Sequence, residues 1–429
     1  MMLKRIFWRT VKKKLADYTR KHEYISRCYL RHSTAFGPQN PLISDFDTAF
    51  FVNVSNIKEW YAVFKNIIDD IKERVFLRNI MENPLVLPAT KNTFRLCKKY
   101  YAHRSIYPME TWHRVDINKP AVPTPPRHSL PLDHAPEGCL ASYITPVLMK
   151  QRKHHLFEHA LLTRALQKDY FRTGANRRKK DANSFYETLL VEFDIWDQFY
   201  KKINFVPTNE NIVFNKSVCC DYTLFRERWS SISSRNKDFG EISSLWIYPS
   251  TRNDDEPNMA LNISSSVSAK MCKKAIETVL KTFHGLKYSL LLGTEQAMIG
   301  RINGLSRVSM LEPWLFKYSG LCLLGNESIR EKVIEPTTHL IREKFMEFLL
   351  YFSFRIPLWE NVYPYAMYRL CFTVDHLLKN RQIILDDKIL KGVYGEEFAS
   401  PETFNPRDDT QKLFSFLRKN QEFDLFGKK

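Results

Sequence analysis

Two aspartates separated by one residue, Asp45 and Asp47, stand directly before the apolar run TAFFV. In a strand, residues i and i+2 point to the same face, so the two carboxylates would project together. Carboxylates held that close repel each other, and a cation between them removes the repulsion. Mg²⁺ suits such a pair, because it keeps several waters and is shared with phosphate oxygens. The spacing therefore favours a magnesium site, while a plain strand start that happens to carry two aspartates is the alternative.

The segment from Cys28 to Val52 resembles the active-site segment of the nucleotidyltransferase superfamily with the DNA polymerase β-like fold. That family has a strand, a turn with Gly-Ser or Gly-Gly, a short spacer and then Asp-x-Asp on the next strand. Here Ser33 lies twelve residues before Asp45, in a chain that reads SDFDTAFFV around the two aspartates. The resemblance covers about residues 20–120. It implies a two-ion Mg²⁺ site on the aspartates, as in the in-line phosphoryl transfer that two metals support.

The same resemblance implies that Ser33 contacts the phosphates of a nucleoside triphosphate (NTP). The glycine that precedes this serine in the family is replaced by His32. A histidine does not allow the same close approach of the backbone to a phosphate. Arg31 or His32 would then supply a charged contact in its place.

The superfamily usually adds a third carboxylate on a later strand, where it holds the metal and acts as base toward the acceptor hydroxyl. Asp116, in ETWHRVDI, is the candidate, and it lies 69 residues beyond Asp47. Asp194 is the second choice, although its segment LLVEFDIWDQF also has a helical pattern. An ordinary loop aspartate at position 116 stays open. The implied activity is transfer of a nucleotidyl group from an NTP to an unidentified acceptor.

Two other classes of function remain. The first is a non-catalytic nucleotide- or polyanion-binding protein that keeps the fold. The second is a zinc hydrolase, because His155, Glu158 and His159 form the pattern H-x-x-E-H. On a helix, histidines at i and i+4 face one way and can share Zn²⁺. A polar helix face in a basic segment explains the same residues.

The chain is basic, with a formal net charge of +18 over 429 residues. A basic field concentrates anions such as nucleotides and nucleic acid. Residues 152–180 hold nine Lys and Arg against two acids. This basic segment could contact an anionic acceptor, or nucleic acid bound without sequence specificity. The alternative is a solvated, charged loop. The sequence contains no P-loop and no G-x-G-x-x-G fingerprint.

Membrane and redox signals are weak. No apolar run reaches the roughly 18 residues that a transmembrane helix needs. Residues 3–20 predict a basic amphipathic helix with Phe7, Val11, Leu15 and Tyr18 on one stripe. Such a helix either docks by its stripe or makes a peripheral membrane contact. Eight scattered cysteines without a C-x-x-C pair favour reduced thiols and a cytoplasmic location.

The expected fold class is α+β, a small mixed-sheet nucleotidyltransferase-like domain followed by a larger, mostly helical region. Six prolines between residues 117 and 137 mark the best boundary. The expected division is residues 1–125, the nucleotidyltransferase-like domain with its basic helix; 126–265, a linker and a helical or irregular middle; and 266–429, a helical region. The sequence shows no internal repeat.

Individual elements follow from local patterns. Four strands are expected, in YISRCYL, ISDFDTAFFV, PLVLP and METWHRVDI. Asn56 and Glu59 form a capping box before a helix whose apolar face runs from Ile57 to Val75. Residues 221–265, rich in Ser and Asn, are ambiguous. Further helices are expected over 268–285, 341–352, 361–380 and 410–422.

Overall fold

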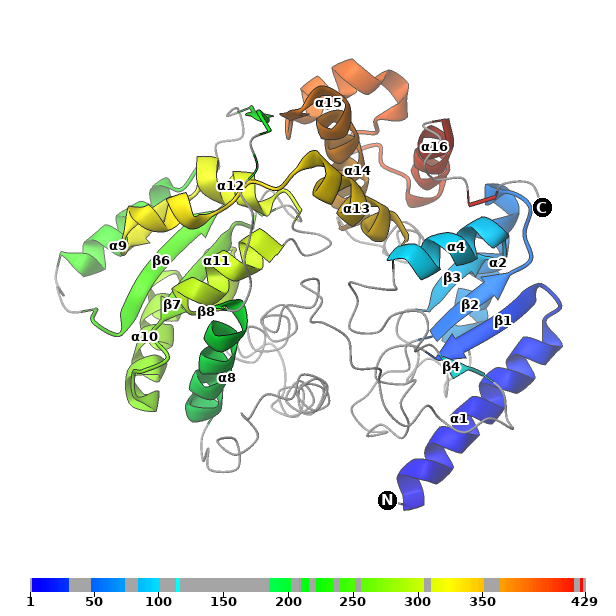
Figure 1. The fold of residues 1–429 in the computed structure, drawn as a ribbon, viewed down its shortest axis with the longest axis horizontal. Coiled ribbons are helices and arrows are strands. Elements are labelled where there is room, and N and C mark those ends of the chain that lie inside the picture. The colour runs from blue at the N-terminus through cyan, green and yellow to red at the C-terminus, as the bar shows by residue number, and fades with distance from the viewer. Residues whose placement is uncertain are drawn as a thin grey trace. The chain divides into compact units, whose positions relative to one another are not determined.

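The computed structural model divides the chain into two compact units, whose elements are labelled in Figure 1. Unit 1 comprises residues 1–131, 345–372 and 387–429, and unit 2 comprises residues 132–344 and 373–386. Both units are therefore discontinuous, unlike the three consecutive segments expected from the sequence. The structure describes residues 2–30, 48–73, 84–100, 113–115, 185–201, 208, 210–215, 221–234, 239–250, 256–304, 310–350, 363–419 and 425–426.

The centre of unit 1 is a four-stranded sheet in the order β3-β2-β1-β4. Its strands are β1 (Ile25–Leu30), β2 (Thr48–Val52), β3 (Leu85–Pro88) and β4 (His113–Arg114). β2 and β4 run antiparallel to β1, and β3 runs parallel to β2. This confirms the small mixed sheet and strands in all four of the predicted segments.

β2 is buried on both faces. All five of its residues have side chains that are shielded from solvent. On one face, Tyr18 of α1 (Met2–Lys21) meets Phe50 edge-on, with ring centroids 6.0 Å apart. On the other face, Phe94 of α4 (Lys91–Tyr100) stacks on Phe51 at 4.3 Å. Helices therefore hold this strand from both sides.

The helix α1 docks on the sheet by its predicted stripe. Val11, Leu15 and Tyr18 are buried, and the Tyr18 hydroxyl donates a hydrogen bond of 3.0 Å to Asp70. Lys12, which is not one of the stripe residues, is also buried, with 4% of its surface exposed. The described part of the stripe packs inside unit 1, as expected for a helix that docks by its apolar stripe. Among the described residues, no helix is long and apolar enough to cross a membrane.

The helix α2 (Ile57–Glu73) covers the same sheet face as α1 and begins at the predicted cap. Asn56 Oδ1 accepts from the backbone N–H of Glu59 at 3.0 Å. The Glu59 carboxylate returns to the N–H and hydroxyl of Ser55, both at 2.7 Å, and not to Asn56. These two hydrogen bonds lower the pKa of Glu59. The buried side of α2 includes Trp60, whose indole N–H donates to the Val86 carbonyl at 3.2 Å.

C-terminal elements complete unit 1. They are α15 (Asp387–Tyr394), the 3-10 helix η7 (Gly395–Glu397) and α16 (Pro406–Lys419). Phe414 of α16 packs on Trp60 of α2, with ring centroids 5.7 Å apart. The Thr90 hydroxyl donates to the Leu425 carbonyl at 2.8 Å. The end of the chain is therefore part of the same core as its beginning.

Unit 2 contains a second four-stranded sheet, in the order β8-β7-β6-β9. Its strands are β6 (Ile242–Tyr248), β7 (Asn258–Ile263), β8 (Ser289–Gly293) and β9 (Leu321–Leu324). β6 and β7 lie in residues 221–265, which the sequence left ambiguous. β8 and β9 are strands within residues 266–429, where only helices were expected. The parallel pair β5 (Val213–Phe214) and β10 (Gln382–Ile383) forms a small separate sheet.

The second sheet also lies between two layers. Ile247 and Met259 point into a core shared with α8 (Phe185–Tyr200), α9 (Thr223–Ser233) and α10 (Ala269–Thr282). Trp246 and Ala260 point to the opposite face, toward α11 (Glu295–Gly304), α12 (Glu312–Ser319) and the 3-10 helix η4 (Glu327–Lys332). Helix α10 ends just before Gly285, which has a φ of +81°, as expected. The helices α13 (Thr338–Phe348) and α14 (Tyr363–Asn380) confirm two more expected helices.

The packing of α16 on α2 predicts a measurable dependence of unit 1 on its C-terminal helix. Phe414→Ala removes a buried ring from Trp60 and should lower the free energy of unfolding by about 3–4 kcal/mol. Ser415→Ala, at the exposed neighbouring position, is the control and should change it by less than about 0.5 kcal/mol. Chemical denaturation measures both. Equal, small effects would mean that α16 does not belong to the core of unit 1.

Candidate functional site

The segments that contain the predicted residues Arg31, His32, Ser33, Asp45 and Asp47 connect to the first sheet at one edge. Leu30, the last residue of β1, pairs with Thr48, the first residue of β2. The chain therefore leaves β1 toward Arg31, His32 and Ser33, and enters β2 from Asp47, at the same edge. We call this the candidate edge. The residues Arg31, His32, Ser33, Asp45, Asp47 and Asp116 themselves lie outside the described part of the chain.

The other two strands also begin at the candidate edge. Leu85 of β3 pairs in parallel with Ala49, and His113 of β4 pairs with Leu30. Four chain segments thus reach this edge. The segment before β3 contains Glu82, which the sequence analysis did not single out; only the pairing of β3 with β2 brings its segment to this edge.

The direction of β4 bears on Asp116. β4 starts at the candidate edge and runs away from it, since the N–H of Val115 donates to the Cys28 carbonyl at 2.8 Å. Asp116 comes next in the sequence and lies outside the described residues. Asp194, the second choice, lies on α8 in unit 2, so its helical pattern is confirmed.

The described cysteine of this sheet, Cys28, is not a thiol nucleophile. Cys28, on β1, is 2% exposed, and burial raises the pKa of its thiol. A protonated, buried thiol is a packing group and not a nucleophile.

Cations gather on the sheet face that α4 covers. Arg27 lies over the Phe94 ring at 5.0 Å, and Arg114 pairs across from Tyr29 on the same face. Both arginines are exposed. α4 contains no acidic residue and adds three exposed cations, Lys91, Arg95 and Lys98.

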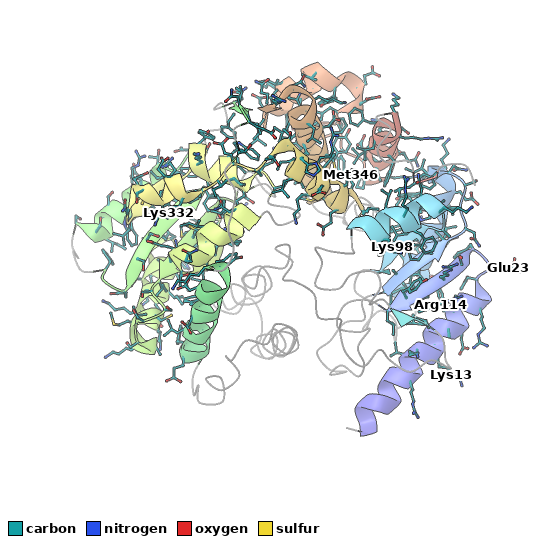
Figure 2. All side chains as sticks on the ribbon, viewed as in Figure 1. Lys13, Glu23, Lys98, Arg114, Lys332 and Met346 are labelled. Atoms are coloured by element: carbon teal, nitrogen blue, oxygen red, sulfur yellow. The ribbon has the colours of Figure 1, made fainter. Side chains whose placement is uncertain are left out.

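α4 lies between β3 and β4 in the chain. The chain enters α4 where β3 ends and next enters the sheet at the candidate edge, with β4. Figure 2 labels Lys98, near the end of α4, and Arg114 on β4. A positive field on this face favours a polyphosphate ligand.

Neither a metal cluster nor a pocket adds to this site. Among the described residues, no group of three His, Cys, Asp or Glu side chains is placed to hold a metal ion. A groove of about 320 Å³ lies where α2 begins, lined by Lys58, Asp408 and Lys412 among others. α2 follows the end of β2, so this groove lies away from the candidate edge, and its charges are of both signs. We assign it no role.

The remaining predicted functional segments are not described. His155, Glu158 and His159 lie outside the described residues, and so do residues 152–180. Comparison of the chain with protein-family models, with curated proteins and with solved structures found no match.

The cations of α4 predict a salt-sensitive anion site in unit 1. Replacing Lys91, Arg95 and Lys98 together by Gln should weaken binding of inorganic tripolyphosphate about tenfold at low salt, because the local positive field is lost. The matched control replaces Arg9, Lys13 and Lys21, which are exposed on α1 over the opposite face. Isothermal titration calorimetry measures both. Equal losses in the two triple variants would show that net charge alone attracts the anion.

Proposed function

We propose that this protein is a Mg²⁺-dependent nucleotidyltransferase that moves a nucleotidyl group from an NTP to an acceptor. One observation carries the proposal: the segment with Ser33 and the segment with Asp45 and Asp47 adjoin the same edge of a buried, mixed sheet. The pairing of Leu30 with Thr48 is what an active site shared by these two segments requires. The cations on the α4 face support a polyphosphate substrate.

The roles of the chain's own residues follow from strand geometry. The proposal continues the alternation of β2 backward, so that Asp45 and Asp47 share the face of Ala49 and Phe51. That is the face covered by α4. The carboxylate pair would hold Mg²⁺, which neutralises phosphate charge during transfer. Ser33, with Arg31 or His32, would bind and orient the phosphates.

Two carboxylates are candidates for the general base that accepts the proton of the acceptor hydroxyl. Asp116 follows a strand that leads away from the candidate edge, and Glu82 precedes a strand that begins there. Geometry therefore favours Glu82 over Asp116 for this role. If neither carboxylate serves, the protein binds the nucleotide without transferring it.

The acceptor is the least defined part of the proposal. The basic residues 152–180 would draw in an anionic acceptor, which includes nucleic acid recognised without sequence specificity. Salt would then weaken binding of the acceptor through this segment. The acceptor site itself is not assigned to any described residue.

The aspartate pair gives the most direct test. Asp45→Asn and Asp47→Asn should each abolish Mg²⁺-dependent NTP binding or reduce transfer by at least about 100-fold, because each removes a metal ligand. The fold should persist, since removing carboxylate repulsion does not destabilise it. Asp69→Asn, an exposed aspartate on α2, is the control. NTP binding that is unchanged in both variants would remove the nucleotidyltransferase proposal.

A second pair of variants distinguishes the two candidate bases. Glu82→Gln should lower the rate of transfer about 100-fold and leave NTP affinity nearly unchanged, as expected of a general base. Asp116→Asn should have a small effect on both quantities. Labelled NTPs incubated with the protein and cell extract supply the readout. The reverse pattern would return the role to Asp116, and two inactive single variants would mean that both carboxylates act.

A further inference from the structure

The two sheets have the same topology. In each, the second strand runs antiparallel to the first, the third runs parallel to the second, and the fourth runs antiparallel to the first. The orders β3-β2-β1-β4 and β8-β7-β6-β9 are therefore the same order. Figure 1 shows the two sheets in separate parts of the chain.

The helices occupy corresponding places along the chain. One helix precedes the first strand (α1 and α9), one joins the second strand to the third (α2 and α10), and one follows the third (α4 and α11). In both units the first two helices cover one face of the sheet and the third covers the other. The helices α4 and α11 both span ten residues. In unit 2, α12 also lies before the fourth strand.

The register of the strands defines which residues correspond. Tyr29, Ala49 and Leu85 are cross-strand neighbours in the first sheet. Tyr248, Asn258 and Ser289 are neighbours in the same way in the second. With this alignment, the residues that face the first two helices in one sheet correspond to the residues that face the first two helices in the other.

One threonine in each unit, between the third strand and the next helix, agrees with that register. Counting on from Leu85 and from Ser289 leads to Thr90 and Thr294, directly before α4 and α11. Both hydroxyls cap their helix by accepting from the backbone N–H three residues on, in each case at 3.1 Å. Both also donate to another element, Thr90 to the Leu425 carbonyl and Thr294 to Asp197.

We propose that residues 223–324 are a second copy of the module formed by residues 2–114, and that this copy does not bind a nucleotide. The second half of this inference rests on the proposed function. Counting back from Asn258 and from Ala49, Asp254 and Glu256 correspond in sequence to Asp45 and Asp47. Of these two, only Glu256 lies within the described residues.

The connection at the corresponding edge is too short to make the expected phosphate site. Residues 31–47, seventeen in number, separate β1 from β2, whereas residues 249–257, nine in number, separate β6 from β7. Ser250 comes only four residues before Asp254, compared with twelve between Ser33 and Asp45. The second copy therefore lacks the length of chain that the proposed function assigns to phosphate binding in the first.

A buried polar cluster occupies the face of this edge in the second copy. Tyr248, the last residue of β6, is fully buried and donates to Glu312 Oε1 at 2.5 Å. Arg301 of α11 donates to the Tyr248 hydroxyl at 2.5 Å and pairs with Glu312 Oε1 at 2.8 Å. The guanidinium thus places a fixed positive charge on the face where a metal ion would bind in the first copy. Phe316 of α12 covers the Tyr248 ring at 5.3 Å.

Nucleotide stoichiometry tests the proposal on the full chain. Equilibrium dialysis with Mg²⁺ and the α,β-methylene analogues of ATP, CTP, GTP and UTP should give one bound nucleotide per chain. The double variant Asp45→Asn/Asp47→Asn should bind none, and Glu256→Gln should still bind one. Two nucleotides per chain, reduced to one by Glu256→Gln, would overturn the proposal. No binding in the unmodified chain would instead count against the proposed function, and the next test then decides this inference.

The cluster has its own readout, which does not depend on nucleotide. Glu312→Gln should lower the melting temperature by roughly 6–12 °C, because it breaks a buried ion pair. Tyr248→Phe is a milder second variant that keeps the ring. Glu277→Gln, in an exposed pair with Lys273 on α10, is the control and should leave the melting temperature unchanged. If Glu312→Gln left the melting temperature unchanged, the cluster would not stabilise this edge of the second copy, and the proposal would be wrong.

The duplication itself is tested by an experimental structure. Superposing β1, β2 and β3 on β6, β7 and β8 should bring Thr90 onto Thr294 without further adjustment. A displacement of these threonines by one residue or more would show that the two sheets are unrelated.

Discussion

The burial of β2 on both faces is the constraint on which unit 1 depends. A strand of five buried residues must be covered by helices on each side, and α1 and α4 supply this through the contacts of Phe50 and Phe51. A central strand held in this way has little freedom to slip, because a shift of one residue would turn each side chain to the other face. The segment that enters β2 therefore starts from a fixed point, which is what a metal-binding carboxylate pair requires.

Local patterns were sufficient to predict much of unit 1. The apolar period of α2, its cap at Asn56 and the apolar run PLVLP all depend on near neighbours in sequence, and the structure confirms them. β6 and β7 were missed because their sequences do not alternate and contain polar residues. Ser244 and Asn262 are buried there and satisfy each other through a hydrogen bond of 2.9 Å. A hydrogen bond between two buried polar side chains on neighbouring strands cannot be predicted from the sequence before the register of the strands is known.

The candidate site shows the same division between local and long-range information. The types and spacing of Asp45 and Asp47 suggest their chemistry without any fold. Whether Asp116 or Glu82 accompanies them depends on the directions of β3 and β4 relative to β1, and these directions are properties of the sheet. The discontinuous units have a similar origin, because contacts such as that of Phe414 with Trp60 join residues that are far apart in sequence.

A repeated module can lose its sequence signal and keep its topology, because the two properties have different physical requirements. The topology needs only apolar faces, a parallel crossover and helix caps, and many side chains satisfy each of these. Phe51 in one sheet and Ala260 in the other occupy corresponding positions, yet each packs against the helix that follows the third strand. Catalysis needs particular groups in particular places. Under our proposal, the longer first connection of one copy serves a phosphate site, whereas in the other copy Arg301 and Glu312 pair with each other at the corresponding edge.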